Sequence, residues 1–160
     1  MGQRIFTEAG DPDPDGSALD SECAKFYHEV AHMAMSVYRL PVTGPEEDAA
    51  DQLAAYILLT PGRGGQVDPK SVHAVKDLAR TLGATGTSPE QLGKADPADV
   101  HSLDQVRMNN LLCWIYGSNP EANADLVTDG QLPRDRASGC PKEWEQLKQT
   151  WSPLLEPHFT

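Results

Sequence analysis

Apolar residues recur every three or four positions along most of the chain, which is the spacing of one face of a helix. The first long helix is predicted to start near Asp20 and to run to about Arg39. Its apolar positions form a single stripe, namely Leu19, Cys23, Phe26, Val30, Met33 and Val37. The helix should end before Pro41, because proline disfavours helical geometry at the residue that precedes it.

The same spacing predicts several shorter helices further along the chain. The second helix begins at Pro45, a residue favoured at the first helical position, and continues to about Thr60. Its first turn holds three carboxylates, which the positive end of the helix dipole stabilises. Further helices are predicted over residues 68–83, from residue 88, and over residues 102–116, 120–128 and 141–151. A short strand over residues 4–7 is the only β structure expected.

These elements indicate a mainly helical fold with little or no β-sheet. A length of 160 residues favours one domain with one modest core. We expect residues 1–18 to form an acidic, flexible N-terminal segment, because residues 9–17 are rich in turn formers and aspartate. Residues 19–160 should then form a single helical domain.

The first predicted helix carries the sequence His28-Glu29-Val30-Ala31-His32. Residues four apart lie one above the other on a helix, so His28 and His32 can place two imidazole nitrogens on one zinc ion. Glu29 is placed to act as general base on a water that the zinc activates, and then as proton donor. A chain of this composition is expected to contain only about 0.01 such motifs by chance. The motif therefore predicts the zinc site of a metallopeptidase.

A catalytic zinc ion needs a third protein ligand and leaves its fourth position to water. Glu47, at the start of the second helix, is the best candidate, and Asp51 lies four residues further along the same face. Asp51 could accept the second N–H of a ligand histidine and so fix its tautomer. The loop over residues 40–44 is long enough to bring the second helix back beside the first. Glu46 and Asp48 should point elsewhere, as solvated capping charges.

The three cysteines, Cys23, Cys113 and Cys140, cannot all pair within one chain. A Cys113–Cys140 disulfide with Cys23 free, and three buried thiols in a reducing cytosol, are equally compatible with this count. The N-terminus has no apolar stretch of the kind found in signal peptides. No apolar run approaches the roughly 20 residues that a membrane span needs.

Three blocks of the chain resemble a bacterial family of predicted zinc metallopeptidases, the domain of unknown function 4344 type. The first block is the histidine motif followed by Leu40-Pro-Val-Thr-Gly-Pro-Glu-Glu-Asp-Ala-Ala-Asp-Gln-Leu-Ala. The second runs from His101 to Ser118, and the third is a cysteine-containing tail that includes Ala137 to Cys140. Together these blocks extend the resemblance over residues 26–159.

The resemblance implies a zincin-like helical core of the gluzincin type, in which the motif helix packs on the helix that bears the third ligand. It implies a peptidase site in which zinc is held by His28, His32 and Glu47 and catalysis is carried by Glu29. Other members usually have a longer N-terminal part with a sheet that holds an extended substrate. The short segment before the motif therefore weakens the expectation of peptide binding more than that of metal binding.

The two later cysteines also recur in this family. That recurrence favours a Cys113–Cys140 disulfide, and hence an exported protein in the periplasm or outside the cell. The absence of a visible signal peptide conflicts with export, so localisation stays open at this point.

The acidic segment near the N-terminus also fits the spacing of a calcium-binding loop. Its oxygen ligands would be Asp11, Asp13, Asp15 and Glu22. An EF-hand needs a helix before the loop, however, and Pro12 and Pro14 stiffen this one. A flexible acidic loop is the commoner structure for such a composition.

A peptidase also needs a group that stabilises the developing oxyanion. By side-chain chemistry the candidates are His101, Arg107 and Tyr116. Each also has an ordinary structural explanation, which is a contact at a helix start, a salt bridge and core packing, respectively.

A net charge of −11 argues against nucleic acid and anionic membranes as partners, because phosphate binding needs clustered lysine and arginine. The sequence therefore predicts a zinc-dependent metallopeptidase that acts on a peptide or protein substrate. The first alternative is an inactive binding module that zinc or calcium stabilises, and a weaker one is a purely structural helical domain. The pattern does not indicate an oligomeric state.

Overall fold

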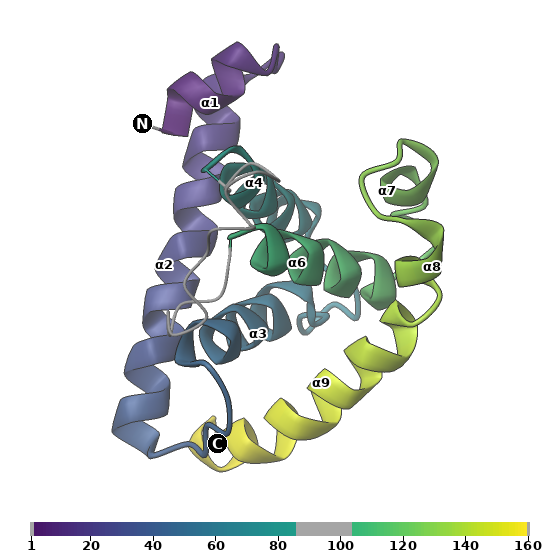
Figure 1. Ribbon diagram of the computed structural model, residues 1–160. Coiled ribbons are helices and arrows are strands. Elements are labelled where there is room, and N and C mark those ends of the chain that lie inside the picture. Colours follow the sequence, from purple (N-terminus) through teal and green to yellow (C-terminus); the bar gives the residue numbers. More distant parts are fainter. Residues whose placement is uncertain (1, 86–103, 160) are drawn as a thin grey trace, which may run out of the picture.

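The computed structural model describes residues 2–85 and 104–159, and every regular element within these ranges is a helix (Figure 1). The longer helices are α2 (Pro14–Tyr38), α3 (Glu46–Leu59), α4 (Pro69–Thr85), α6 (Asp104–Ser118) and α9 (Cys140–Leu155). The shorter elements are α1 (Gly2–Glu8), α7 (Asp125–Thr128), α8 (Arg134–Ala137) and the 3₁₀ helix η1 (Glu156–His158). The predicted mainly helical fold is confirmed.

Most predicted helices occur with ends that differ by a few residues. Those predicted over 45–60, 68–83, 102–116 and 141–151 correspond to α3, α4, α6 and α9. The helix predicted over 120–128 is shorter, because turns occupy its first half and only α7 is helical. The pattern does not predict α8, and the helix predicted from residue 88 lies outside the described residues.

Helix α2 begins at Pro14, well before the predicted start near Asp20. The carboxylate of Asp13 caps the helix by accepting a hydrogen bond from the Gly16 N–H at 3.1 Å, and Pro14 occupies a favoured position in the first turn. The acidic segment that we expected to be a loop is thus partly helical. The proposed domain limits, 1–18 and 19–160, stay a prediction.

Residues 2–8 form α1, so the strand predicted over residues 4–7 is wrong. Helix α1 packs on α2, and its Phe6 side chain is fully buried. The guanidinium of Arg80, on α4, lies 4.6 Å from the centre of the Phe6 ring, a cation–π contact. A helix suits this segment because it can bury one aromatic side chain while its polar neighbours stay in water.

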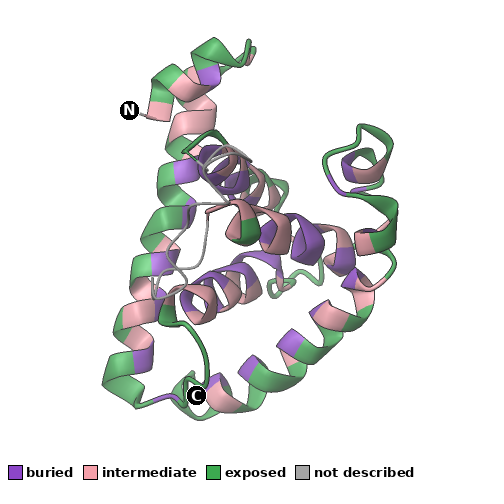
Figure 2. Cartoon of the chain, viewed as in Figure 1, coloured by how far each residue is buried: buried purple, intermediate pink, exposed green. Residues whose placement is uncertain are grey.

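The side of α2 that faces the core lies opposite its apolar stripe (Figure 2). The buried residues on this side are Ser21, Ala24, His28, Ala31 and Met35, and three of them are small. Small side chains let α3 and α4 pack closely against α2. The stripe faces solvent instead, with Leu19 71% and Phe26 64% exposed.

The core lies where α3, α4 and α6 meet, and α9 covers one side of it (Figure 1). Its fully buried side chains include Leu53, Leu59, Val75, Leu111 and Ile115. At Gly117 of α6 the backbone of Cys140 lies so close that a Cβ atom would collide with it. In the ranges that the structure describes, no helix is both long and apolar enough to cross a membrane.

Candidate metal centre

Helix α2 places the two motif histidines one turn apart, on the side that faces α3. The Nε2 atoms of His28 and His32 lie 3.1 Å from each other. His28 is buried, whereas the side chain of His32 is 24% exposed. The paired imidazole nitrogens therefore lie at the edge of the core, where solvent can reach them.

The first turn of α3 brings Glu47 to this pair of nitrogens. Its Oε2 atom lies 3.3 Å from Nε2 of His28, and its Oε1 atom lies 3.4 Å from Nε2 of His32. Two ligands of a tetrahedral zinc ion with bonds of about 2.0–2.1 Å are separated by about 3.3 Å. The three side chains thus lie close enough together to hold one metal ion, with a different oxygen of Glu47 nearest to each histidine.

The other ring nitrogen of His28 is held by a carboxylate from the same helix as Glu47. Nδ1 of His28 lies 2.8 Å from Oδ1 of Asp51, whose side chain is almost completely buried. An Nδ1–H that donates to Asp51 leaves Nε2 with its lone pair directed at the donor cluster. Asp51 therefore lies where it can select the tautomer of His28 that binds a metal.

A second carboxylate holds the other histidine, and the sequence did not suggest it. Nδ1 of His32 lies 2.8 Å from Oε1 of Glu46. The expectation that Glu46 points away from the site is wrong, because Glu46 and Glu47 face different nitrogens of the His32 ring. The expectation that Glu46 is solvated is confirmed, since its side chain is 64% exposed. Asp48, by contrast, is not fully solvated, since its Oδ1 atom is buried without a partner in the described parts of the chain.

Arg107 of α6 contacts two of the carboxylates that α3 contributes to this site. Its Nε and Nη2 atoms donate to Asp51 at 2.7 and 3.0 Å, and its Nη1 atom lies 3.5 Å from Oε2 of Glu47. Burial would raise the pKa of Asp51, but the hydrogen bonds from His28 and Arg107 outweigh it and hold that pKa below its usual value. Arg107 thus keeps a buried carboxylate ionised beside the metal donors.

The three oxyanion candidates have different positions. Arg107 is engaged with Asp51 and Glu47, which corresponds to the salt-bridge explanation. Tyr116 packs against the core, nine residues and hence about 13 Å further along α6 than Arg107. His101 lies outside the described residues.

Glu29 follows His28 directly and points away from the core. Its side chain is exposed, and it makes no hydrogen bond or ion pair with any residue that the structure describes. A carboxylate that is next to a candidate metal ligand in sequence and is not already engaged is free to accept a proton from a water molecule.

These donors belong to a chain that matches a known family along most of its length. Residues 3–155 match DUF4344, a family described as "Putative metallopeptidase". The chain belongs to this family. No curated protein and no solved structure matches it. The match includes every residue of the candidate metal centre, and it confirms the resemblance that the sequence motifs indicate.

The calcium-loop hypothesis finds no support, because α2 begins inside the acidic segment and removes the loop. The four carboxylates have separate partners: Asp11 binds Arg80 at 2.6 Å, Asp13 caps α2, Asp15 accepts from Gln3 at 2.6 Å and Glu22 pairs with Lys25 at 3.0 Å. Among the described residues, one cluster has three metal donors close together, and it is His28, His32 and Glu47.

Cys113 of α6 and Cys140 at the start of α9 form a disulfide, and Cys23 is free and exposed. Beside the disulfide, Arg136 forms a two-pronged ion pair with Glu143 at 2.6 and 2.8 Å. Disulfides persist in oxidising environments and are rare in the cytosol. The bond therefore points to an oxidising location for this DUF4344 protein.

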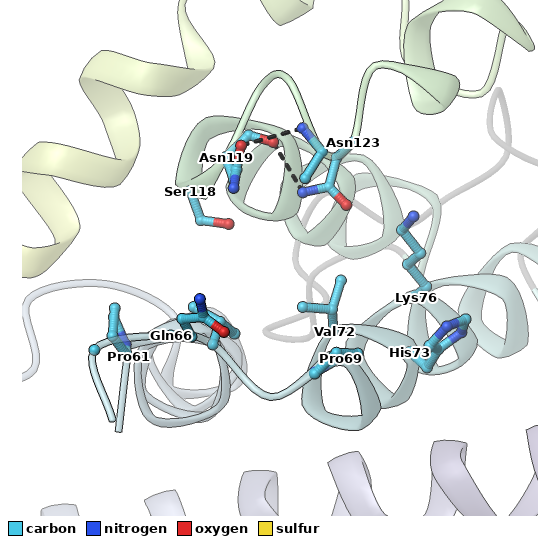
Figure 3. Close-up of a pocket in the computed structure, with 12 residues that line it drawn as sticks. Pro61, Gln66, Pro69, Val72, His73, Lys76, Ser118, Asn119 and Asn123 are labelled. Carbon is cyan, nitrogen blue, oxygen red and sulfur yellow. Dashed lines mark hydrogen bonds between the residues drawn. The ribbon is translucent and has the colours of Figure 1, made fainter. Parts of the chain in front are cut away.

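A cavity of about 550 Å³ lies between the loop after α3, the start of α4 and the end of α6 (Figure 3). Val72, His73 and Lys76 of α4 lie on one side of it, and Asn119 and Asn123 lie on the other. The 14 residues of α3 separate this cavity from the metal centre, a length of about 20 Å. The cavity is therefore distinct from the metal centre.

Proposed function

We propose that this DUF4344 protein is a zinc-dependent metallopeptidase. The observation that carries the proposal is the group of three donor side chains, His28, His32 and Glu47, whose ligand atoms lie within 4.8 Å of one another. Two histidines with one glutamate is a ligand set of catalytic zinc, and three protein ligands leave one position for the reaction.

The surroundings of the donors support zinc better than a structural ion pair. Each histidine has a carboxylate on Nδ1, Asp51 for His28 and Glu46 for His32, and such partners orient metal-binding imidazoles. Neutral imidazoles and a carboxylate suit a borderline ion such as zinc, whereas calcium requires more oxygen ligands.

The bound zinc would supply Lewis acidity that activates water and polarises the peptide carbonyl. Glu29 would take the proton of the attacking water and deliver it to the leaving amine, so that one carboxylate acts as base and then as acid. Asp51 and Glu46 would keep the two imidazoles in their metal-binding tautomers. Arg107 would offset the negative charge that Glu47 and Asp51 bring together.

We also propose that the protein is exported, because the Cys113–Cys140 disulfide requires an oxidising compartment to persist. Fractionation of cells that produce the natural protein should place it outside the cytosol. Recovery of the protein from the cytosol with reduced thiols would contradict this part of the proposal.

The test compares the natural chain with its Glu29→Gln variant. Both proteins should contain about one zinc ion per chain after dialysis against zinc, as measured by mass spectrometry of the metal, because Glu29 is not a ligand. Only the natural chain should hydrolyse a mixture of peptides, with products identified by mass spectrometry. Loss of a general base typically reduces the rate by a factor of about 100 to 10,000.

Two results would contradict the proposal. A natural chain that binds no zinc after reconstitution would remove the metal site itself. Full zinc occupancy without hydrolysis of any peptide would instead favour the inactive, metal-stabilised binding module.

A further inference from the structure

The apolar side chains on the outer face of α2 form a stripe that the fold leaves uncovered within the described residues. We define the α2 stripe as Leu19, Cys23, Phe26, Val30, Met33 and Val37. The exposed fractions of Leu19, Phe26, Met33 and Val37 are 71%, 64%, 59% and 67%. Large contiguous apolar surfaces are rare on soluble proteins and usually mark a binding surface.

The α2 stripe is continuous with the metal centre on the surface of one helix. Phe26 precedes Glu29 by three residues, and Met33 follows it by four, so both side chains adjoin the Glu29 side chain at a Cβ separation of about 5–6 Å. Met33 also follows the ligand His32 directly. A molecule held beside Glu29 therefore contacts Phe26 and Met33 as well.

The dimensions of the α2 stripe suit an extended polypeptide. Val37 follows Leu19 by 18 positions along the helix, which is a rise of about 27 Å. An extended chain rises about 3.3 Å per residue, so the stripe can contact about eight residues of such a chain. Residues within two positions of the bond next to Glu29 would reach Phe26 or Met33.

Charges along the α2 stripe favour a basic partner. Asp15, Asp20, Glu22 and Glu29 flank the stripe, and the chain as a whole carries a net charge of −11. The nearby Lys25 is paired with Glu22 at 3.0 Å. A second copy of the chain would bring the same acidic flanks near each other, whereas a basic polypeptide would be attracted to them.

We infer that the α2 stripe binds the substrate polypeptide and directs it to Glu29. The preferred substrates are unfolded segments with a large apolar side chain within two residues of the cleaved bond and with basic residues around it. Folded proteins bury most such side chains, so their surfaces offer few of these segments. This inference rests on the proposed peptidase function, and it names the class of substrate.

The experiment measures peptide binding by the zinc-loaded Glu29→Gln protein, in which bound peptide is not consumed. The probes are three fluorescein-labelled peptides of 10 residues. One has central Leu and Phe with flanking Lys and Arg, the second replaces Leu and Phe by Ser, and the third replaces Lys and Arg by Glu. The apolar basic peptide should bind at least tenfold more tightly than either of the others.

Single substitutions locate the contact. In the Glu29→Gln protein, Phe26→Ser and Met33→Ser should each weaken binding of the apolar basic peptide by about tenfold, because each removes a large apolar contact. Val106→Ser and Phe159→Ser are matched controls, since these side chains are 46% and 71% exposed but lie off the stripe. They should leave the binding unchanged.

Equal binding of the three peptides, or unchanged binding by Phe26→Ser and Met33→Ser at full zinc content, would overturn the inference. A dimer that sedimentation velocity detects and that Phe26→Ser dissociates would also overturn it, since the stripe would then join two copies. Hydrolysis by the natural chain without apolar or basic preference would overturn this inference but leave the proposed function intact. Stripe-dependent binding without any hydrolysis would support the binding surface and contradict the peptidase function.

Discussion

The two ends of α6 are held to the rest of the molecule by different interactions. Near its start, Arg107 binds Asp51 and Glu47 of α3 through hydrogen bonds and an ion pair. Near its end, Cys113 is bonded to Cys140 of α9, and the packing at Gly117 leaves no space for a side chain. The start of α6 is thus held by a network of charged side chains, and its end is held by a covalent bond and close packing.

The disulfide end stabilises the fold by itself, whereas the charged end is arranged to receive a ligand. The charged end gathers Glu46, Glu47 and Asp51 around two histidines, an arrangement in which desolvation offsets much of the electrostatic attraction. A bound cation would relieve the repulsion among these carboxylates and stabilise the folded state. The disulfide end needs no ligand, so the two ends should respond independently to mutation.

The largest expected effect on metal binding is at the charged end. His32→Ala removes a donor but leaves the contacts among His28, Asp51 and Arg107 in place, so the apo fold should persist. Zinc affinity should fall by more than about 100-fold, the upper end of what loss of an outer partner of a metal ligand costs. Competition with a coloured chelator measures the affinity, and His73→Ala is the control because His73 lies on α4. Unchanged affinity would exclude His32 as a ligand.

The largest expected effect on the stability of the fold is at the disulfide end. Cys113→Ser, which opens a loop with a sequence separation of 27 residues, should lower the free energy of unfolding by about 3.5 kcal/mol in the chain-entropy description. Zinc affinity should stay the same, because the disulfide does not contact the donors. Urea titration with and without zinc measures both quantities, and Cys23→Ser is the control. A parallel loss of zinc affinity would show that the two ends are coupled.

Arg107→Met tests the charged network without removal of a metal donor. The variant leaves Asp51 buried with one fewer partner, so the apo protein should lose about 3 kcal/mol of stability. Arg4→Met is the control, because the Arg4–Glu8 pair is exposed and contributes less than about 0.5 kcal/mol. Thermal unfolding of the two variants in a chelator provides the comparison. Equal stability of Arg107→Met and Arg4→Met would mean that the ion pair between Arg107 and Asp51 does not stabilise the protein in solution.

Glu46→Gln should produce a smaller change. The amide can still accept a hydrogen bond from His32, but it lacks the charge that strengthens a metal-binding imidazole, so zinc affinity should fall about tenfold. Glu145→Gln is the control, because Glu145 is an exposed residue of α9. A drop as large as that of His32→Ala would mean that Glu46, rather than Glu47, acts as the third ligand.

The smallest expected effect is the dependence of the folding stability on pH. The pKa of Asp51 lies below its usual 3.8, so ionised Asp51 stabilises the fold fully above pH 3.8, and this contribution is lost as the pH falls through the lowered pKa. The pKa of His28 is raised above 6.5, because Asp51 outweighs the opposing effect of burial. Its contribution is therefore present below pH 6.5 and is lost as the pH rises through the raised value.

Urea titrations of the metal-free natural chain and its Asp51→Asn variant, from pH 3 to pH 8, separate these contributions. The stability difference between the two proteins should be largest between pH 4 and pH 6 and should shrink toward both ends of the range. A difference that is independent of pH would mean that Asp51 contributes through packing alone.

The local pattern was sufficient to predict the longer helices and the most specific chemistry, but it missed α1 and α8. Residues four apart share a helix face, so the positions of His28 and His32 on one side of a helix depend only on local geometry. The acidic start of α3 is also local, because the helix dipole favours carboxylates in a first turn. Family membership followed from contiguous motifs and was likewise readable from the chain.

Packing between helices that are distant in sequence selects which faces of these helices are buried and which residues they contact. The regular apolar spacing of α2 indicates a stripe, but close packing against α3 and α4 selected the side with Ala24 and Ala31, and the stripe faces solvent. Glu46 meets His32, and Arg107 meets Asp51 56 residues away in the chain. Such contacts depend on how helices distant in sequence are placed in space, which no local periodicity encodes.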